Sequence, residues 1–291
     1  EAVLRTVAAV KKARAGLSDP NRPDAVLLYL GPTGVGKSEL CKALARNIFG
    51  SSDHFASFDM SEFVEQHTVS KLLGAPPGYV GHGEEGRLIQ AIRNMPFSIL
   101  LFDEIEKAHP RIFDIFLPVL DEGRLRDHNG REVSFRNCII IFTSNIGSEC
   151  LQRQDSFDEK LLMDSLRRSF RPEFINRIDE IVPFYPLLLE DIRGILNRFV
   201  RELDKRLAER QIGFHMYQGA YELISERGYK PEFGARELRR TFERLIVSPI
   251  SARLLDNQIR KGDKVEVLVE DGELVFRHGK QAAVSAGDTR G

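Results

Sequence analysis

The sequence predicts an α/β protein with a parallel sheet, followed by a smaller α+β domain. Three short apolar runs predict strands that are buried on both faces, at residues 26–30, 98–102 and 138–143. Helical patterns separate these runs, at residues 39–49, 86–94 and 111–120. Because strands that alternate with helices are typical of parallel sheets, the first part of the chain should form one.

The start of the chain and its overall charge exclude several classes of protein. Residues 1–16 form an amphipathic helical pattern whose charges are untypical of a signal peptide. No apolar run approaches the roughly 18 residues of a membrane span. The formal net charge of -1 gives no general attraction to nucleic acid or to anionic membranes, so we expect neither as a partner. Since the sequence begins inside a helical pattern without an initiator methionine, we expect it to be a piece of a longer protein.

The cysteines indicate a reducing environment. Cys41, Cys138 and Cys150 are odd in number and lack the spacing of metal ligands. Three free thiols are the simplest interpretation, and they fit the cytoplasm or the matrix of an organelle.

The pattern changes after residue 187. Apolar residues at helical spacing predict a long helix over residues 189–211, and further helices follow at 217–226 and 235–257. Residues 263–277 alternate between apolar and polar side chains and turn at Asp271-Gly272, which predicts a β-hairpin.

Two domains are therefore expected, since 291 residues exceed the usual size of one compact domain. We place a large α/β domain at residues 1–187 and a small α+β domain at residues 188–278. The small, polar residues 279–291 should form a disordered tail.

A glycine-rich loop carries the most specific chemical signal. Residues 31–38, GPTGVGKS, fit the pattern G-x-x-x-x-G-K-[ST] between a predicted strand and a predicted helix. In such a loop backbone N–H groups surround phosphates, Lys37 contacts the outer phosphates and Ser38 binds Mg²⁺. The other predicted nucleotide contacts are Pro32, Thr33, Gly34, Val35, Gly36 and Glu39.

Polar residues end two of the predicted buried strands. Asp103 and Glu104 follow the strand at 98–102, at the edge where open α/β sheets bind ligands. Asp103 would hold the Mg²⁺ ion through its water shell, and Glu104 would orient and polarise the attacking water. Asn145 follows the strand at 138–143 and could hold that water against the γ-phosphate, although asparagine is also common in ordinary turns. Together with the phosphate loop, these residues predict hydrolysis of a nucleoside triphosphate.

Longer runs of the sequence resemble the second nucleotide-binding module of the Clp/heat-shock unfoldase family of AAA+ ATPases. The matching runs cover roughly residues 1–270 in the order of the family: RARAGLSDPNRP, GPTGVGKSEL, DMSEF, HTVSKLLGAPPGYVGHGEEG, LLFDEIEKAHP, VLDEGRLRD, FRNCIIIFTSNIGSE, FRPEFINRIDEIVPF and GYKPEFGARELRR. The resemblance implies a five-stranded parallel sheet between helices, followed by a smaller lid domain.

The resemblance also implies a ring of subunits. In FINRID, Arg177 matches the arginine finger that reaches the ATP site of the neighbouring subunit. In GAREL, Arg236 matches the second sensor, an arginine of the small domain that contacts the γ-phosphate. In the family that the sequence resembles, these roles imply a homo-hexamer of the full-length protein, with ATP and Mg²⁺ at each subunit interface.

A second glycine-rich segment presents one tyrosine. GYVG, formed by Gly78, Tyr79, Val80 and Gly81, matches the pore loop with which the family grips its substrate. An aromatic ring grips a threaded polypeptide by its area with little dependence on sequence, and flanking glycines let the loop move. Residues 124–133 match a turn that lines the lower channel, but an ordinary solvated hairpin turn remains an equal alternative.

The expected substrates are unfolded or aggregated proteins, with other chaperones as possible partners. Family members that dock a peptidase carry an aliphatic-Gly-Phe/Leu tripeptide that residues 146–170 lack, and IGF at 212–214 should belong to the core. We therefore expect no docking to a peptidase. The alternatives are a machine that dismantles a secretion sheath, a supplier of a peptidase, a nucleic-acid motor and a non-hydrolysing scaffold.

Overall fold

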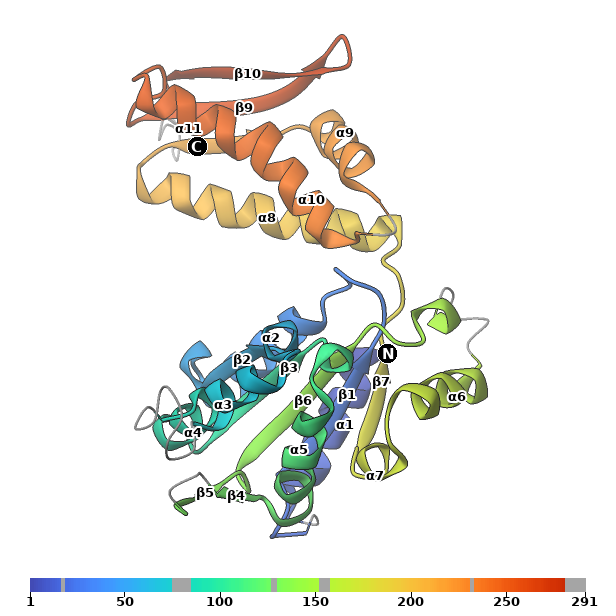
Figure 1. The fold of residues 1–291 in the computed structure, drawn as a ribbon. Helices are drawn as coiled ribbons and strands as arrows, with labels where there is room; N and C mark the ends of the chain where they lie inside the picture. The colour runs from blue at the N-terminus through green and yellow to red at the C-terminus, as the bar shows by residue number, and fades with distance from the viewer. Residues whose placement is uncertain (17–18, 75–84, 127–129, 152–157, 231–232, 281–291) are drawn as a thin grey trace, which may run out of the picture. The chain divides into compact units, whose positions relative to one another are not determined.

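The computed structural model describes residues 1–16, 19–74, 85–126, 130–151, 158–230 and 233–280. The chain divides into two compact units, Glu1–Pro186 and Leu187–Gly291 (Figure 1). Each unit has a hydrophobic core of its own. Within the described ranges, no helix is long and apolar enough to cross a membrane.

A five-stranded parallel sheet forms the centre of the first unit. Its strands lie in the order β2-β3-β6-β1-β7. Their bounds are β1 Ala25–Leu30, β2 Phe55–Asp59, β3 Ser98–Asp103, β6 Cys138–Ser144 and β7 Glu180–Pro183. The three central strands are the apolar runs of the sequence, and almost every residue in them is buried. The structure thus confirms the predicted α/β class.

The two edge strands have no such signal in the sequence. In β2 only Phe58 is buried, and β7 has four residues and ends on a proline. An edge strand is partly open to solvent and needs no continuous apolar run. A search for fully buried strands therefore passes over both.

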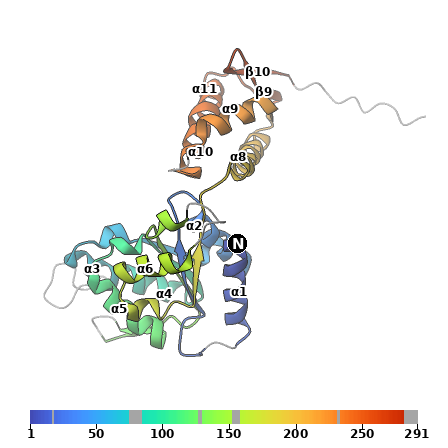
Figure 2. The same ribbon diagram turned by 90° about the vertical axis from the view of Figure 1, so that its right-hand side faces the viewer.

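Helices cover both faces of this sheet, with α1 on one side and α3 to α6 on the other (Figure 2). Side chains of β1 alternate between two clusters: Leu27 and Tyr29 pack with α1 and α2, whereas Leu28 and Leu30 pack with α3 to α7. The helix bounds are α1 Ala2–Arg14, α2 Lys37–Phe49, α3 Gln66–Leu73, α4 Arg87–Asn94, α5 Pro110–Glu122, α6 Glu159–Ser169 and α7 Pro172–Ile175. A two-stranded hairpin of β4 (Arg124–Arg126) and β5 (Glu132–Ser134) follows α5.

Two glycines shape the turn from β1 into α2. Gly36 precedes the helix with φ of 103°, a backbone conformation that side chains disfavour. A Cβ atom on Gly31 would lie 2.2 Å from the carbonyl oxygen of Phe184. The glycine spacing of the loop therefore has a local steric reason, apart from any ligand.

The second unit packs helices on a small mixed sheet. Its sheet has the order β10-β9-β8, in which β9 pairs with β10 antiparallel and with β8 parallel. The element bounds are α8 Leu189–Glu209, β8 Gly213–Met216, α9 Gln218–Gly228, α10 Ala235–Phe242, α11 Ser248–Leu255, β9 Asp263–Glu270 and β10 Glu273–Lys280. The predicted hairpin is confirmed, because Asp271 and Gly272 connect β9 and β10 with φ angles of 49° and 78°.

Two boundaries differ from the sequence-based expectation. The helix predicted over residues 235–257 consists of α10, a π-helical turn at Glu243–Val247, and α11, which has Pro249 in its first turn. Proline cannot donate the helical hydrogen bond, so a change in hydrogen bonding before it is expected. Strand β10 runs to Lys280, two residues into the predicted tail, since Gly279 and Lys280 pair with β9.

Candidate functional site

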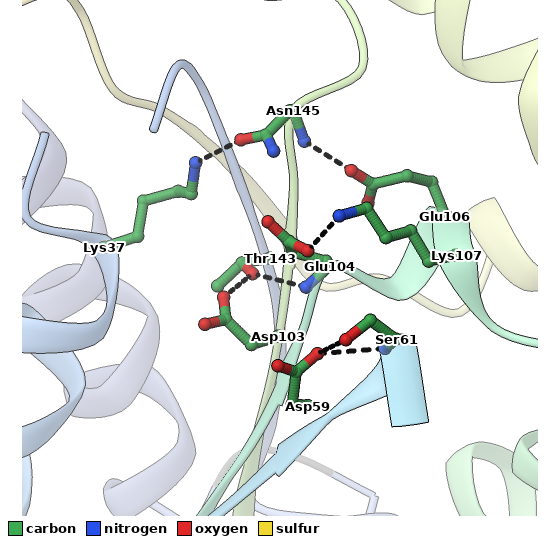
Figure 3. A network of polar contacts seen from close by, with 9 residues as sticks. All are labelled: Lys37, Asp59, Ser61, Asp103, Glu104, Glu106, Lys107, Thr143 and Asn145. Atoms are coloured by element: carbon green, nitrogen blue, oxygen red, sulfur yellow. Dashed lines mark hydrogen bonds and ion pairs between the residues drawn. The ribbon is translucent and has the colours of Figure 1, made fainter. Parts of the chain in front are cut away.

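The polar residues predicted from three separate motifs lie together at one edge of the large sheet. Lys37 follows β1, Asp103 ends β3, and Asn145 follows β6 (Figure 3). These strands are neighbours and parallel, so their carboxyl ends meet at the same edge. This is where ligands bind in open α/β sheets.

Lys37 connects the glycine-rich loop to the strand beside it. Its side chain is buried, and Nζ donates hydrogen bonds to the carbonyl oxygens of Gly31 and Pro32, the second at 3.0 Å. Nζ also donates to Oδ1 of Asn145 at 2.9 Å. A buried ammonium group is stable only when oxygens surround it. The outer oxygens of a phosphate are suited to the same role.

Asp103 is held by a buried threonine of the next strand. The hydroxyl of Thr143 donates to Oδ1 of Asp103 and accepts a hydrogen bond from the backbone N–H of Glu104 at 3.0 Å. Thr143 is fully buried. One hydroxyl therefore fixes both acidic residues, and among the described residues no protein group donates to Oδ2 of Asp103.

Glu104 has an unusual backbone and a paired carboxylate. Its φ and ψ angles of 57° and 51° lie in the left-handed region, which for a residue other than glycine costs on the order of 1–3 kcal/mol. Its Oε2 accepts from Nζ of Lys107 at 2.5 Å, and this hydrogen bond is the main cause that raises the pKa of Lys107.

Asn145 is fixed through its backbone by a third acidic residue. Its N–H donates to Oε1 of Glu106 at 3.2 Å. The other oxygen of Glu106 is buried and has no hydrogen-bond partner among the described residues. Glu106 therefore ties the helical turn after β3 to the end of β6, beside Lys37 and Asn145 (Figure 3).

The donor set fits a magnesium ion bound together with phosphate. Ser38 is the second residue of α2 and is half-buried, and Asp103 offers a carboxylate. Mg²⁺ prefers oxygen ligands and usually keeps several waters, so one or two protein oxygens are enough. Over the described residues, no cluster of three or more His, Cys, Asp or Glu could hold a metal by itself. The remaining predicted contacts, Pro32, Thr33, Gly34, Val35 and Glu39, lie in the loop and in the first turn of α2.

Arg177 lies at the opposite edge of the sheet. It precedes β7. The backbone N–H of Asp179 donates to the carbonyl oxygen of Val26 at the start of β1, and the N–H of Val26 donates to the carboxylate of Asp179. From Val26 to Gly31, β1 advances by five residues, or about 16 Å at the usual strand rise. The structure therefore does not bring Arg177 to Lys37 of the same chain.

Arg236 belongs to the second unit. It is the second residue of α10, and its side chain is exposed. Among the described residues its guanidinium has no ion-pair partner. The structure describes the placement of this residue within its own unit only.

The two predicted channel loops are described unequally. The predicted pore loop, Gly78, Tyr79, Val80 and Gly81, lies outside the described residues. The segment at 124–133 begins and ends in the β4–β5 hairpin, where Arg124 and Arg126 pair with Glu132 at 3.8 and 3.3 Å. Both interpretations of that segment, a channel lining and a solvated turn, stay open.

Comparison with known proteins decides the family. Residues 22–181 match the family described as AAA domain (Cdc48 subfamily). The chain belongs to this AAA-domain family. The stretch contains the whole edge cluster around Lys37, Asp103 and Asn145. Directly after this AAA domain, residues 187–267 match the C-terminal, D2-small domain of ClpB protein.

Several curated relatives of this AAA domain are named chaperone protein ClpB. The relative from Aquifex aeolicus is 48% identical over an alignment of 287 residues; the match covers 94% of this chain and 28% of the relative. The relative from Meiothermus ruber is 48% identical, and the match covers 90% of this chain and 31% of the relative. The relative from Synechocystis is 45% identical, and the match covers 95% of this chain and 31% of the relative. The chain thus spans about a third of the length of the curated relatives it matches.

Sequence reasoning missed three residues of the AAA site. Thr143, Glu106 and Lys107 all lie inside runs that match the family, but none of them has a role in the interpretation of the sequence. A polar residue one or two positions before the end of a buried strand is the signal that could have found Thr143. The contacts of Glu106 depend on how two strands pair, which no local pattern shows.

Proposed function

We propose that this AAA domain hydrolyses ATP and that the full-length protein uses this energy to unfold or disaggregate other proteins. The observation that carries the proposal is the position of Lys37, Asp103, Glu104 and Asn145 at one edge of the sheet, beside a phosphate-binding loop. The names of the relatives support the choice of protein substrates.

Each residue of the edge cluster has a role in this proposal. Lys37 exchanges its carbonyl partners for the β- and γ-phosphate oxygens of ATP. Bound Mg²⁺ would neutralise phosphate charge, with Ser38 and Asp103 as its protein-side contacts. Glu104 orients and polarises the attacking water, and Asn145 holds that water against the γ-phosphate.

Residues beyond the edge cluster require neighbouring subunits. Because Arg177 lies about one strand length from the phosphate loop of its own chain, we propose that it completes the site of an adjacent subunit. Stabilisation of transition-state charge by such an arginine is worth 10³–10⁵-fold in related phosphoryl-transfer enzymes. The proposed assembly is a homo-hexamer in a reducing compartment. Arg236 remains a candidate second contact to the γ-phosphate.

The first experiment tests ATP hydrolysis. Lys37→Ala should abolish nucleotide binding, whereas Glu104→Gln should retain ATP and lose turnover. Lys12→Ala is a matched control, because Lys12 is an exposed lysine of helix α1 to which the proposal gives no role. Phosphate release and binding of a fluorescent ATP analogue are measured for each variant. Wild-type hydrolysis by Glu104→Gln would contradict the assigned role.

The second experiment tests protein unfolding in the full-length protein. Tyr79→Ala should preserve ATP hydrolysis and abolish the ATP-dependent loss of fluorescence from a stably folded reporter with an unstructured tail. Tyr217→Ala, a change at an exposed tyrosine of the second unit, should leave both rates intact. If Tyr79→Ala unfolds the reporter as fast as the wild type, the threading role of this loop is wrong.

A further inference from the structure

Arg177 is held at both ends by residues to which the preceding sections give no role. Its guanidinium forms a two-point ion pair with Asp121: Nε donates to Oδ1 at 2.6 Å and Nη2 to Oδ2 at 2.6 Å. Nη1 donates to the carbonyl oxygen of Glu173. At the other end, the carbonyl oxygen of Arg177 accepts from Nη2 of Arg22 at 2.9 Å.

Asp121 and Arg22 connect Arg177 to the end of helix α5. Asp121 lies in the last turn of α5, and Nε of Arg22 donates to the carbonyl oxygen of the preceding residue, Leu120, at 2.9 Å. Arg22 also pairs with Asp179 at 3.3 Å, and the second carboxylate oxygen of Asp179 accepts from the backbone of β1 at 2.8 Å. Asp121 and Arg22, which hold the side chain and the backbone of Arg177, are therefore both anchored to elements that pack in the core.

The number of hydrogen-bond donors on Arg177 shows whether its guanidinium is only oriented by its partners or fully occupied by them. A guanidinium group has five N–H donors in a fixed plane. Asp121 takes two and Glu173 takes one, so two donors, one on each Nη atom, remain without a protein acceptor among the described residues. A two-point pair fixes the plane of the group, while the two remaining donors suit an oxygen of a phosphate.

The exposure of the pair argues against a purely structural role. The side chain of Arg177 is 26% exposed and that of Asp121 is 43% exposed. Ion pairs this open to solvent contribute little to folding stability, since water screens them. A pre-oriented arginine, however, loses less conformational freedom when it contacts a ligand.

We propose that Asp121 is a positioning residue that holds Arg177 ready for the ATP site of an adjacent subunit. This inference rests on the proposed function, in which Arg177 acts between subunits. Asp121 touches no nucleotide itself. It sets the plane of the guanidinium, and Arg22 sets the backbone from which that side chain extends.

A complementation experiment in the full-length protein tests the role of Arg177 between subunits and the positioning role of Asp121 separately. One subunit carries Lys37→Ala, so it binds no ATP at this site but keeps its arginine. The other carries Arg177→Ala, so it binds ATP but lacks the arginine. Each is inactive alone, and their mixture should recover ATP hydrolysis where the first subunit faces the site of the second. No recovery would overturn the proposed role of Arg177, and with it this inference.

Asp121→Asn is then added to one subunit at a time. In the Lys37→Ala subunit, which supplies the arginine, it should lower the recovered rate about tenfold with an unchanged KM for ATP. In the Arg177→Ala subunit the same change should have no effect, which serves as the matched control. An equal loss of rate with Asp121→Asn in either subunit would show a structural effect and overturn the inference. A higher rate would mean that Asp121 restrains Arg177 and would overturn it as well.

Two further measurements guard against misfolding. Asp121→Asn should leave Tm nearly unchanged, and Asp121→Glu, which keeps the charge, should recover part of the rate. A fall in Tm with no recovery of rate in Asp121→Glu would show that Asp121 stabilises the fold and would overturn the inference.

Discussion

Glu106 offers the sharpest test of the geometry around Asn145. Glu106→Ala removes the acceptor of the Asn145 backbone N–H, which the carboxylate binds at 3.2 Å. A hydrogen bond to a charged group is worth about 1.5–3 kcal/mol. Each 1.36 kcal/mol in a barrier changes a rate about tenfold, so a full effect on the transition state would be roughly 10- to 150-fold.

The expected loss lies at the lower end of that range. The bond is long for an N–H donor, so we expect kcat for ATP hydrolysis to fall about tenfold in Glu106→Ala. Glu106→Gln keeps an oxygen acceptor, and its kcat should stay within about threefold of the wild type. Glu209→Ala, at an exposed acid on α8, is the control for removal of a carboxylate.

The assay is steady-state phosphate release at saturating ATP, with the affinity for ADP and Tm measured in parallel. An unchanged affinity for ADP in Glu106→Ala would confirm that the nucleotide site remains formed. If that variant hydrolyses ATP within twofold of the wild type, the argument that Glu106 fixes the position of Asn145 is wrong. A loss in Glu106→Gln as large as in the alanine variant would show that charge, and not the acceptor, matters.

Two other predictions follow from the contacts of the first unit. Lys107→Ala frees Oε2 of Glu104 from its ion pair at 2.5 Å. Because this pair is partly exposed, it is worth about 0–1 kcal/mol, and kcat should rise by no more than about fivefold. A tenfold fall in kcat would contradict this interpretation. Burial raises the pKa of Cys138 to about 11 and raises that of Cys41 further, so both thiols stay protonated near neutral pH. At about pH 8, iodoacetamide should therefore modify the half-exposed Cys150 first, as peptide mapping by mass spectrometry would show; equal modification of Cys138 would contradict the burial argument.

Features that depend on consecutive residues were readable from the sequence. The turn at residues 31–38 needs a left-handed glycine at 36 and a lysine and hydroxyl at fixed offsets, and all of these are neighbours in the chain. The hairpin at Asp271-Gly272 and the three central strands have the same origin. Backbone sterics and the spacing of apolar residues act over a few positions, so a local pattern suffices to predict them.

Pairings between distant segments required the tertiary structure. Glu106 reaches Asn145 across 39 positions, and Asp121 reaches Arg177 across 56. Neither contact has a local signal, because each depends on the strand order β2-β3-β6-β1-β7 and on where helix α5 ends. Arg177 precedes β7 whereas Lys37 follows β1, and because these strands are parallel the two residues lie at opposite ends of the strands. The sequence by itself thus determined the phosphate loop and its chemistry, whereas core packing decided which residues orient that chemistry, since only packing brings distant segments into contact.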